Sequence, residues 1–216
     1  KYEPGSQVPL YFSVKVDKQP TGYGVFHGEQ VEVGQSVATG VGAGLYLTFS
    51  TAEQEQITAK VGLSYTSVAN ARLNRETEAA TCSFEEAKAE AVQTWEDYLG
   101  RIRVETANRA DKLKFYTGLY HALLGRGLAS DVNGAYPKHN GAIGQIPMKE
   151  GKPAFSFYNS DAAWGAQWNL SQLWALAYPE YLSDYISTHL QVYKDGGWLA
   201  DGIANSRYVS GVGTNL

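Results

Sequence analysis

Apolar and polar residues alternate along the first third of the chain, which is the pattern of half-buried β-strands. The alternating runs cover residues 9–17, 45–49 and 57–65, and two shorter runs around a glycine loop at 23–33 indicate a hairpin. Each run has one apolar face. We therefore expect an antiparallel sheet whose apolar face, including Val61 and Leu63, is covered by another part of the protein.

The spacing of apolar residues becomes helical after residue 80. Residues 70–80 are polar and form a predicted connector, after which Ser83 and Glu86 supply a capping box. The predicted helices cover residues 83–99, 111–125, 161–178 and 179–195. The first of them would have about four or five turns. Residues 129–153 should contain a hairpin of their own, and the tail from Trp198 onward is loop-like.

The stretch Phe115–Pro137, FYTGLYHALLGRGLASDVNGAYP, joins the β-rich half to the helical half. It is predicted to be the back of a helix followed by a loop that carries Asp131, Asn133 and Tyr136. Two interpretations stay open at this point. The segment is either a turn and a piece of core, or one wall of a binding site.

Composition and charge exclude several classes of partner. The chain has 216 residues, 44% of them apolar, and its net charge of −4 comes without a cluster of Lys or Arg, so binding of nucleic acid or of an anionic membrane is not expected. It contains no apolar run long enough to span a bilayer, and its first residues lack the pattern of a signal peptide. Cys82 is the only cysteine and the four histidines are scattered, which argues against a zinc site.

The aromatic composition favours a small polar ligand. Fifteen Tyr and five Trp stand against seven Phe, so most aromatic rings carry a polar edge. Such rings suit surfaces that are partly wet, including sugar-binding clefts.

Several segments, taken in their order and spacing, resemble glycoside hydrolase family 92, which comprises bacterial exo-acting α-mannosidases. The most specific are VGLSYTSVANARLN and the helix FYTGLYHALL with the loop DVNGAYP. The segments FEEAKAEAVQTWEDYLGRIRVE and LWALAYPEYLSDYISTHL also take part in the resemblance. The resemblance implies an α+β protein with an antiparallel β-sandwich portion at residues 1–80 and a linker helix at 81–104. Residues 105–216 would then be the first helices of an (α/α)₆ barrel.

The resemblance also implies an activity. Family members hydrolyse α-mannosides in mannose-containing oligosaccharides with calcium and with inversion at the anomeric carbon. The catalytic acid, the catalytic base and the calcium ligands are implied to lie downstream of this chain. We therefore expect no catalytic or metal-binding residue here and no activity of the chain alone. The family implies a secreted, periplasmic or cell-surface location, and an incomplete barrel suggests a partner chain or a dimer that covers it.

Six residues are candidates for contact with the sugar: Asp131, Asn133, Tyr136, Asp161, Trp164 and Trp168. The chain departs from the family at two of the neighbouring positions. Where many members have Trp-Asp-x-x-Arg, Gly165 replaces the sugar-contacting aspartate and Trp168 takes the arginine position. Asp161 could supply a substitute carboxylate or cap a helix, and the tryptophans could stack on a sugar or pack in the core.

Two other functions remain open from the sequence. The chain could be a non-catalytic module that binds carbohydrate or has a structural role. It could also be related to sugar phosphorylases or glucoamylases, which likewise combine a sandwich with a helical barrel.

Overall fold

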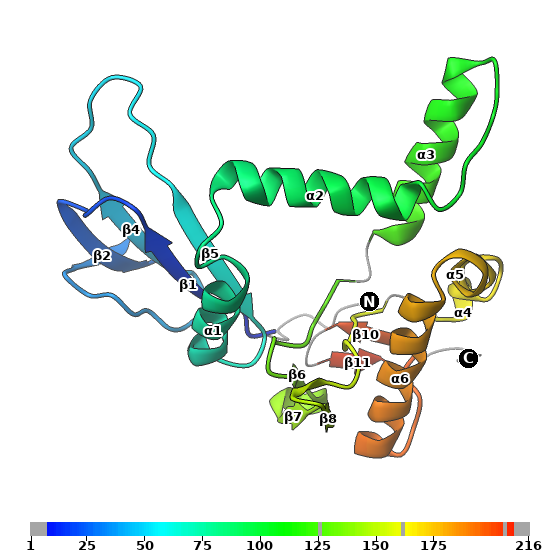
Figure 1. Ribbon diagram of the computed structural model, residues 1–216. Coiled ribbons are helices and arrows are strands. Elements are labelled where there is room, and N and C mark those ends of the chain that lie inside the picture. Colours follow the sequence, from blue (N-terminus) through cyan, green and yellow to red (C-terminus); the bar gives the residue numbers. More distant parts are fainter. Residues whose placement is uncertain (1–7, 125–126, 161–162, 205–206, 210–216) are drawn as a thin grey trace. The chain divides into compact units, whose positions relative to one another are not determined.

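The structure, a computed structural model, describes residues 8–124, 127–160, 163–204 and 207–209 (Figure 1). It divides into two compact units, one formed by Val14–Val61 and the other by the described parts of Lys1–Ser13 and Gly62–Leu216. The division cuts strands β1 (Tyr11–Val16) and β5 (Ala59–Ser64), which pair with each other. The domain boundary at residue 80 stays a prediction. Over the described ranges, no helix has both the length and the apolar character needed to cross a membrane.

The smaller unit contains a three-stranded antiparallel sheet in the order β3-β2-β4. Its strands are β2 (Gly22–His27), β3 (Gln30–Val33) and β4 (Ala43–Thr48), which confirms the predicted hairpin. Aromatic rings lie over glycines on the neighbouring strand. A Cβ atom at Gly44 would lie 2.2 Å from the ring of Phe26, and one at Gly24 would lie 2.6 Å from the ring of Tyr46. The glycines therefore give the rings room on this sheet.

Most of the segment predicted to be a connector, residues 70–78, belongs to helix α1 (Val68–Glu78). The helix begins at Ser67, whose hydroxyl accepts a hydrogen bond from the Asn70 backbone N–H at 3.0 Å. Arg75 on this helix is buried and donates to the Ser13 hydroxyl at 2.8 Å. Specific hydrogen bonds hold this mostly polar helix in place. The spacing of apolar residues in the sequence does not reveal such bonds, so it could not predict the helix.

The buried face of β5 is the opposite of the one predicted. Val61 and Leu63 each expose 54% of their surface, whereas Gly62 and Ser64 are buried. The reason is the close approach of α1, since a Cβ atom at Gly62 would lie 2.1 Å from the Ala71 carbonyl oxygen. Small residues face the helix because larger ones would not fit.

Substitution of Gly62 by alanine should therefore destabilise the protein by about 2 kcal/mol. The added methyl group would overlap the backbone of α1 at Ala71 and Arg75, and backbone does not yield as a flexible side chain does. Gly118→Ala is the matched control, because nothing lies within 4 Å of a Cβ at that exposed helix position. It should leave stability unchanged or raise it by up to about 1 kcal/mol through helix propensity. Urea unfolding measures both, and equal midpoints would contradict the proposed close approach.

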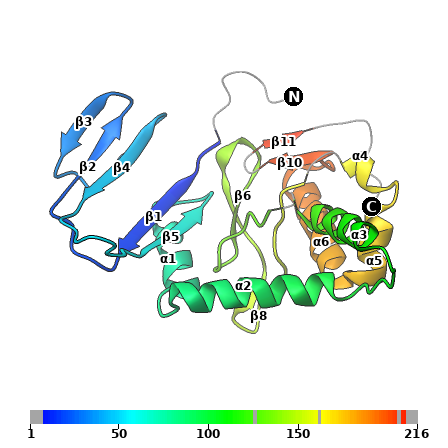
Figure 2. The ribbon, with the colours of Figure 1, turned by 90° about the horizontal axis from the view of Figure 1, so that it is seen from above.

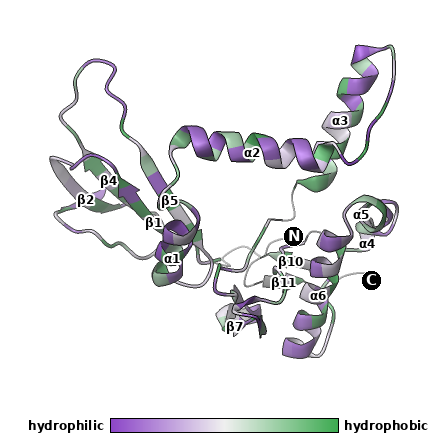
Figure 3. Ribbon diagram, in the orientation of Figure 1, coloured by the Kyte–Doolittle hydropathy of each residue, from purple (hydrophilic) through white to green (hydrophobic). Residues whose placement is uncertain are grey.

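Two helices follow, α2 (Phe84–Leu99) and α3 (Arg109–Leu123). The predicted capping box is confirmed: the Ser83 hydroxyl accepts from the Glu86 N–H at 3.2 Å, and the Glu86 carboxylate accepts from the Ser83 N–H at 2.7 Å. No residue of α2 is buried, and Leu119 is the one buried residue of α3. Figure 3 shows polar and apolar residues mixed along both helices.

A break divides the helix predicted at 161–178. The structure has α4 (Ala163–Ala166) and α5 (Leu170–Ala177), separated by a turn. The side chains of Ser171 and Gln172 donate to the carbonyls of Ala166 and Gln167, at 3.1 and 2.9 Å, and so replace helical hydrogen bonds at the break.

Helix α6 (Pro179–Gly196) begins and ends as predicted. Pro179 occupies the first turn, and Gly197 adopts a left-handed conformation with φ of 76° just after the end.

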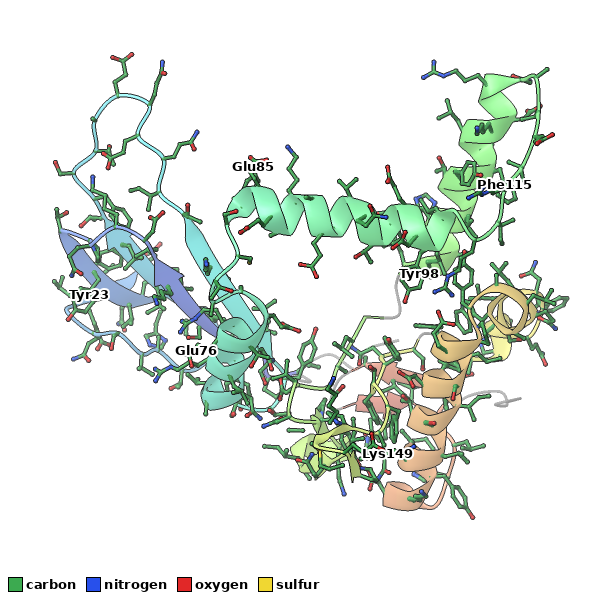
Figure 4. All side chains as sticks on the ribbon, viewed as in Figure 1. Tyr23, Glu76, Glu85, Tyr98, Phe115 and Lys149 are labelled. Carbon is green, nitrogen blue, oxygen red and sulfur yellow. The ribbon has the colours of Figure 1, made fainter. Side chains whose placement is uncertain are left out.

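Aromatic packing joins the end of α2 to α3, α5 and α6. The rings of Tyr98 and Tyr178 stack with centroids 5.9 Å apart, and the Tyr178 hydroxyl donates to the Tyr98 carbonyl at 3.0 Å. The Arg101 guanidinium lies over both rings and bonds to Glu180. Trp174 and Leu119 are buried in the same cluster. Figure 4 labels Tyr98 at the end of α2 and Phe115 on α3.

Short strands make up the rest of this unit. They are β6 (Ala135–Pro137), β7 (Ile143–Gln145), β8 (Met148–Lys149), β9 (Lys152–Pro153), β10 (Gly202–Ala204) and β11 (Arg207–Val209), with a 3₁₀ turn η1 (His139–Gly141). The antiparallel pair β6-β7 confirms the predicted hairpin, whereas β10-β11 lies in a tail predicted to be loop. In both views β6 lies between α1 and α6 (Figures 1 and 2).

Candidate functional site

Asp131 is the centre of a buried hydrogen-bond network. Its side chain is almost fully buried and accepts hydrogen bonds from the Ser64 hydroxyl at 3.0 Å, from the Thr66 hydroxyl, and from the Asn74 amide at 2.7 Å. The Asn74 side-chain oxygen accepts in turn from the Val132 N–H at 3.0 Å. A buried carboxylate needs such donors. The network therefore attaches the loop that carries Asp131 and Val132 to the end of β5 and to α1.

Asn133 extends this network along α1. Its amide donates to the Asn70 side-chain oxygen at 3.0 Å, and its own oxygen accepts from the Ala135 N–H at 3.1 Å. Asn70 also donates to the Thr66 hydroxyl at 2.7 Å. Asn70 and Asn74 lie one turn apart, so the same face of α1 presents both amides to the loop.

Tyr136 is the centre of a second network, at the other end of β6. Its ring is fully buried, its hydroxyl donates to Asp195 at 2.5 Å, and it accepts from the Gln191 amide at 2.9 Å. Lys138 forms an ion pair with Asp195 at 2.9 Å. Burial, together with the neighbouring Asp195 carboxylate, raises the pKa of the Tyr136 hydroxyl well above its usual range. Tyr136 is therefore a neutral hydrogen-bond donor that ties β6 to α6.

The two candidate tryptophans have exposed rings. Trp164 on α4 is 44% exposed, and Trp168, in the turn between α4 and α5, is 75% exposed. The nearly buried Asp201 positions α4, since its carboxylate accepts from the Trp164 N–H at 3.2 Å and its carbonyl from the Ala163 N–H at 2.6 Å. Exposed indole faces on a fixed backbone are typical of surfaces on which sugars stack.

His189 is a fully buried histidine on α6. Its ring packs on Tyr185 with centroids 4.6 Å apart, and neither ring nitrogen has a hydrogen-bond partner among the described residues. Burial lowers the pKa of His189 to about 4, although the Asp201 carboxylate acts in the opposite direction. The ring is therefore neutral at pH 7, with one nitrogen able to donate and the other able to accept.

The structure thus separates the predicted site residues into two groups. Asp131, Asn133 and Tyr136 are engaged in hydrogen bonds that hold the fold together, and Trp164 and Trp168 lie exposed on other elements. Contact of any of them with a sugar stays a prediction, and Asp161 lies outside the described residues.

Sequence reasoning did not single out Asn70, Asn74 or Asp201 as hydrogen-bonding residues. It also did not single out His189 as a buried polar group. The spacing of Asn70 and Asn74 on a polar helix was a usable signal. Nothing in the sequence marked the environment of His189, because its neighbour Asp201 comes from a different segment.

The described residues contain no group of three or more His, Cys, Asp and Glu side chains arranged to hold a metal ion. The requirement for calcium stays a prediction.

Two consecutive family models match the chain. The N-terminal domain of glycosyl hydrolase family 92 matches residues 2–64, and the catalytic domain of the same family matches residues 70–215. The chain belongs to glycosyl hydrolase family 92. A comparison with curated protein sequences found no match.

Solved structures of family 92 proteins share the fold. The α-mannosidase BT3965 from Bacteroides thetaiotaomicron superposes with a TM-score of 0.78 at 23% identity, over 93% of this chain and 27% of its own. The inverting mannosidase BT2199 from the same organism gives 0.75 at 21% identity, over 89% of this chain and 26% of its own. BT3965 has also been solved in complex with mannoimidazole.

These matches confirm the predicted fold class, an α+β family 92 fold with antiparallel strands followed by helices. They also show that the chain spans about a quarter of the length of the solved relatives.

Proposed function

We propose that this chain is part of an exo-α-mannosidase of family 92 that hydrolyses mannose-containing oligosaccharides. The observation that carries the proposal is the match of the family's N-terminal and catalytic domain models, in that order, to residues 2–64 and 70–215. The structural relatives named as mannosidases support the choice of mannose. A sugar hydrolase also agrees with the exposed rings of Trp164 and Trp168.

The finer proposal is an inverting mechanism that requires calcium. Inversion needs a carboxylic acid that protonates the leaving oxygen and a carboxylate that activates water, about 6.5–9.5 Å apart. Among the described aspartates, Asp131 and Asp195 are engaged as hydrogen-bond acceptors inside the fold, and Asp201 holds α4. We place the acid, the base and the calcium ligands in a longer parent protein. That protein is proposed to act outside the cell, in the periplasm or on the cell surface.

The residues of this chain would serve the reaction by binding and positioning. Trp164 and Trp168 offer flat faces for a sugar ring, and Asp201 fixes the backbone that carries Trp164. The Asp131 network would hold the loop before β6 in place.

The same exposed tryptophans favour one second candidate, a non-catalytic carbohydrate-binding module. Isothermal titration of the chain with mannose and short mannosides distinguishes the two. Micromolar binding by this chain alone would favour the module, and absence of binding would favour part of an enzyme.

Several large apolar side chains are exposed on α2, on α3 and the residue after it, and on α5. They are Phe84, Val92, Leu113, Phe115, Leu124 and Leu176. Exposed apolar surface of this kind favours association. We propose that further parent sequence covers it, and that a partner chain or a second copy does so where that sequence is lacking.

The activity prediction has two parts. The pure 216-residue chain should release no mannose from aryl or disaccharide α-mannosides above a buffer blank, because the acid and the base are proposed to lie in the longer parent protein. The full-length parent should release mannose, lose that activity in a calcium chelator and regain it on addition of calcium. Proton NMR of the first product should show the β-anomer. Turnover by the pure chain would refute the first part, and an inactive parent would refute the function.

A further inference from the structure

Ser160 and His189 are buried polar residues whose side chains have no hydrogen-bond partner in the part of the chain that the structure describes. The Ser160 hydroxyl and both His189 nitrogens are inaccessible to solvent and have no hydrogen-bond partner among the described residues. An unpaired buried polar group costs about 1–3 kcal/mol, so three such atoms in one region call for a ligand.

The backbone brings these side chains to the same region. Ser160 exchanges two backbone hydrogen bonds with Ile203, at 2.9 and 2.8 Å, which places it beside the segment that carries Asp201. The preceding Tyr158 N–H donates to the hydroxyl of Thr188, the neighbour of His189, at 3.2 Å. Asp201 belongs to the same segment as Ile203, and its carboxylate opposes the lowering of the His189 pKa by burial. Segments 158–160 and 201–203 therefore meet at this part of α6.

The chemistry of the three side chains selects the ligand. A neutral imidazole offers one donor and one acceptor, a serine hydroxyl offers both, and a carboxylate accepts. A cation is disfavoured because the histidine and the serine must also donate, and an anion is disfavoured by Asp201. A hydroxyl group both donates and accepts, and it matches this set.

We propose that Ser160, His189 and Asp201 form a binding site for a hydroxyl group, supplied either by an internal water molecule or by a sugar. The water source depends only on the fold. The sugar source rests on the proposed function, and it requires the surrounding side chains to open, because the three atoms are closed to solvent. Asp201 connects this region to the exposed Trp164, from whose backbone N–H it accepts a hydrogen bond.

The direction in which Ser160→Ala changes the Tm of thermal unfolding tests the proposal. If the hydroxyl binds a ligand, its removal should lower the Tm by about 2–4 °C, as expected for loss of a buried hydrogen bond in a chain of this size. If the hydroxyl is unpaired, its removal should leave the Tm unchanged or raise it, which would overturn the proposal. Ser183→Ala, the same change at an exposed position of α6, is the control and should have no effect.

Addition of methyl α-mannoside separates the two sources. A Tm that rises with the sugar in the unmodified protein but not in Ser160→Ala indicates a sugar hydroxyl. A destabilised Ser160→Ala with no response to sugar indicates water. The water result would stand even if the parent had no mannosidase activity, so failure of the proposed function is distinguishable from failure of this proposal.

A crystal structure of the protein is the second measurement. We expect a non-protein oxygen within about 3.2 Å of both the Ser160 hydroxyl and a ring nitrogen of His189. A dry void at that position, or a protein side chain filling it, would refute the site.

Discussion

Replacement of Asp131 by alanine should lower the free energy of unfolding by about 3 kcal/mol, because a buried carboxylate that accepts several hydrogen bonds would be lost. The substitution leaves the Ser64 and Thr66 hydroxyls and the Asn74 amide without their acceptor in a buried environment. It also frees the loop from two separate elements, β5 and α1. Urea unfolding followed by circular dichroism measures the change.

Two further variants make the interpretation specific. Asp97→Ala removes an exposed carboxylate of α2 that accepts one hydrogen bond from Gln93, and it should change stability by no more than about 0.5 kcal/mol. Asp131→Asn keeps the shape but replaces one acceptor oxygen with a donor, so it should destabilise nearly as much as the alanine. If Asp131→Ala instead unfolded like the unmodified protein while the parent lost mannoside binding, Asp131 would be a sugar contact and not an anchor.

The parts of the fold that were predictable depend on neighbours in sequence. The β2-β3 hairpin follows from a period of two, and the start of α2 follows from the capping box of Ser83 and Glu86. Gly197 stops α6 because glycine adopts the left-handed conformation without strain. In each case the residues that decide the structure lie within a few positions of one another.

The parts that were not predictable depend on distant residues. Asp131 accepts a hydrogen bond from Asn74, which lies 57 positions away in the sequence. The turn sequence around Asp131 therefore could not predict that its side chain is buried. Val61 and Leu63 were predicted to lie on the covered face of the strand, because apolar residues usually lie on the buried side. Instead, the close fit of Gly62 against α1 determines which face of β5 is buried. The break at 167–169 arises from side chains that bond to backbone carbonyls, which helical periodicity does not detect.

The same limit applies to the candidate site. Tyr and Trp content indicated sugar-binding surfaces, and the structure leaves Trp164 and Trp168 exposed while it buries Tyr136 and Trp174. Composition reports how many such rings exist, but only the packing decides which of them reach solvent.

The stability of the protein should fall as the pH is lowered from about 6.5 to about 4, and His189 is the cause. Its folded-state pKa of about 4 lies below the ordinary value of 6.5, so in this window the unfolded chain binds a proton that the folded chain does not. The stability contributed by the neutral buried ring is therefore fully present above pH 6.5 and is lost as the pH falls towards 4. The full loss corresponds to about 3 kcal/mol.

The decisive comparison is between His189→Leu and His121→Asn, with urea midpoints measured at half-unit pH steps. His189→Leu should remove the slope of stability against pH in this window. His121→Asn should keep it, because His121 is exposed on α3 and lies outside the buried surroundings of His189. Acid sensitivity from other groups of the protein is common to both variants and cancels in the comparison. NMR titration of the His189 ring gives its pKa directly, and a ring that titrates near 6.5 in the folded protein would show that it is not held neutral by burial.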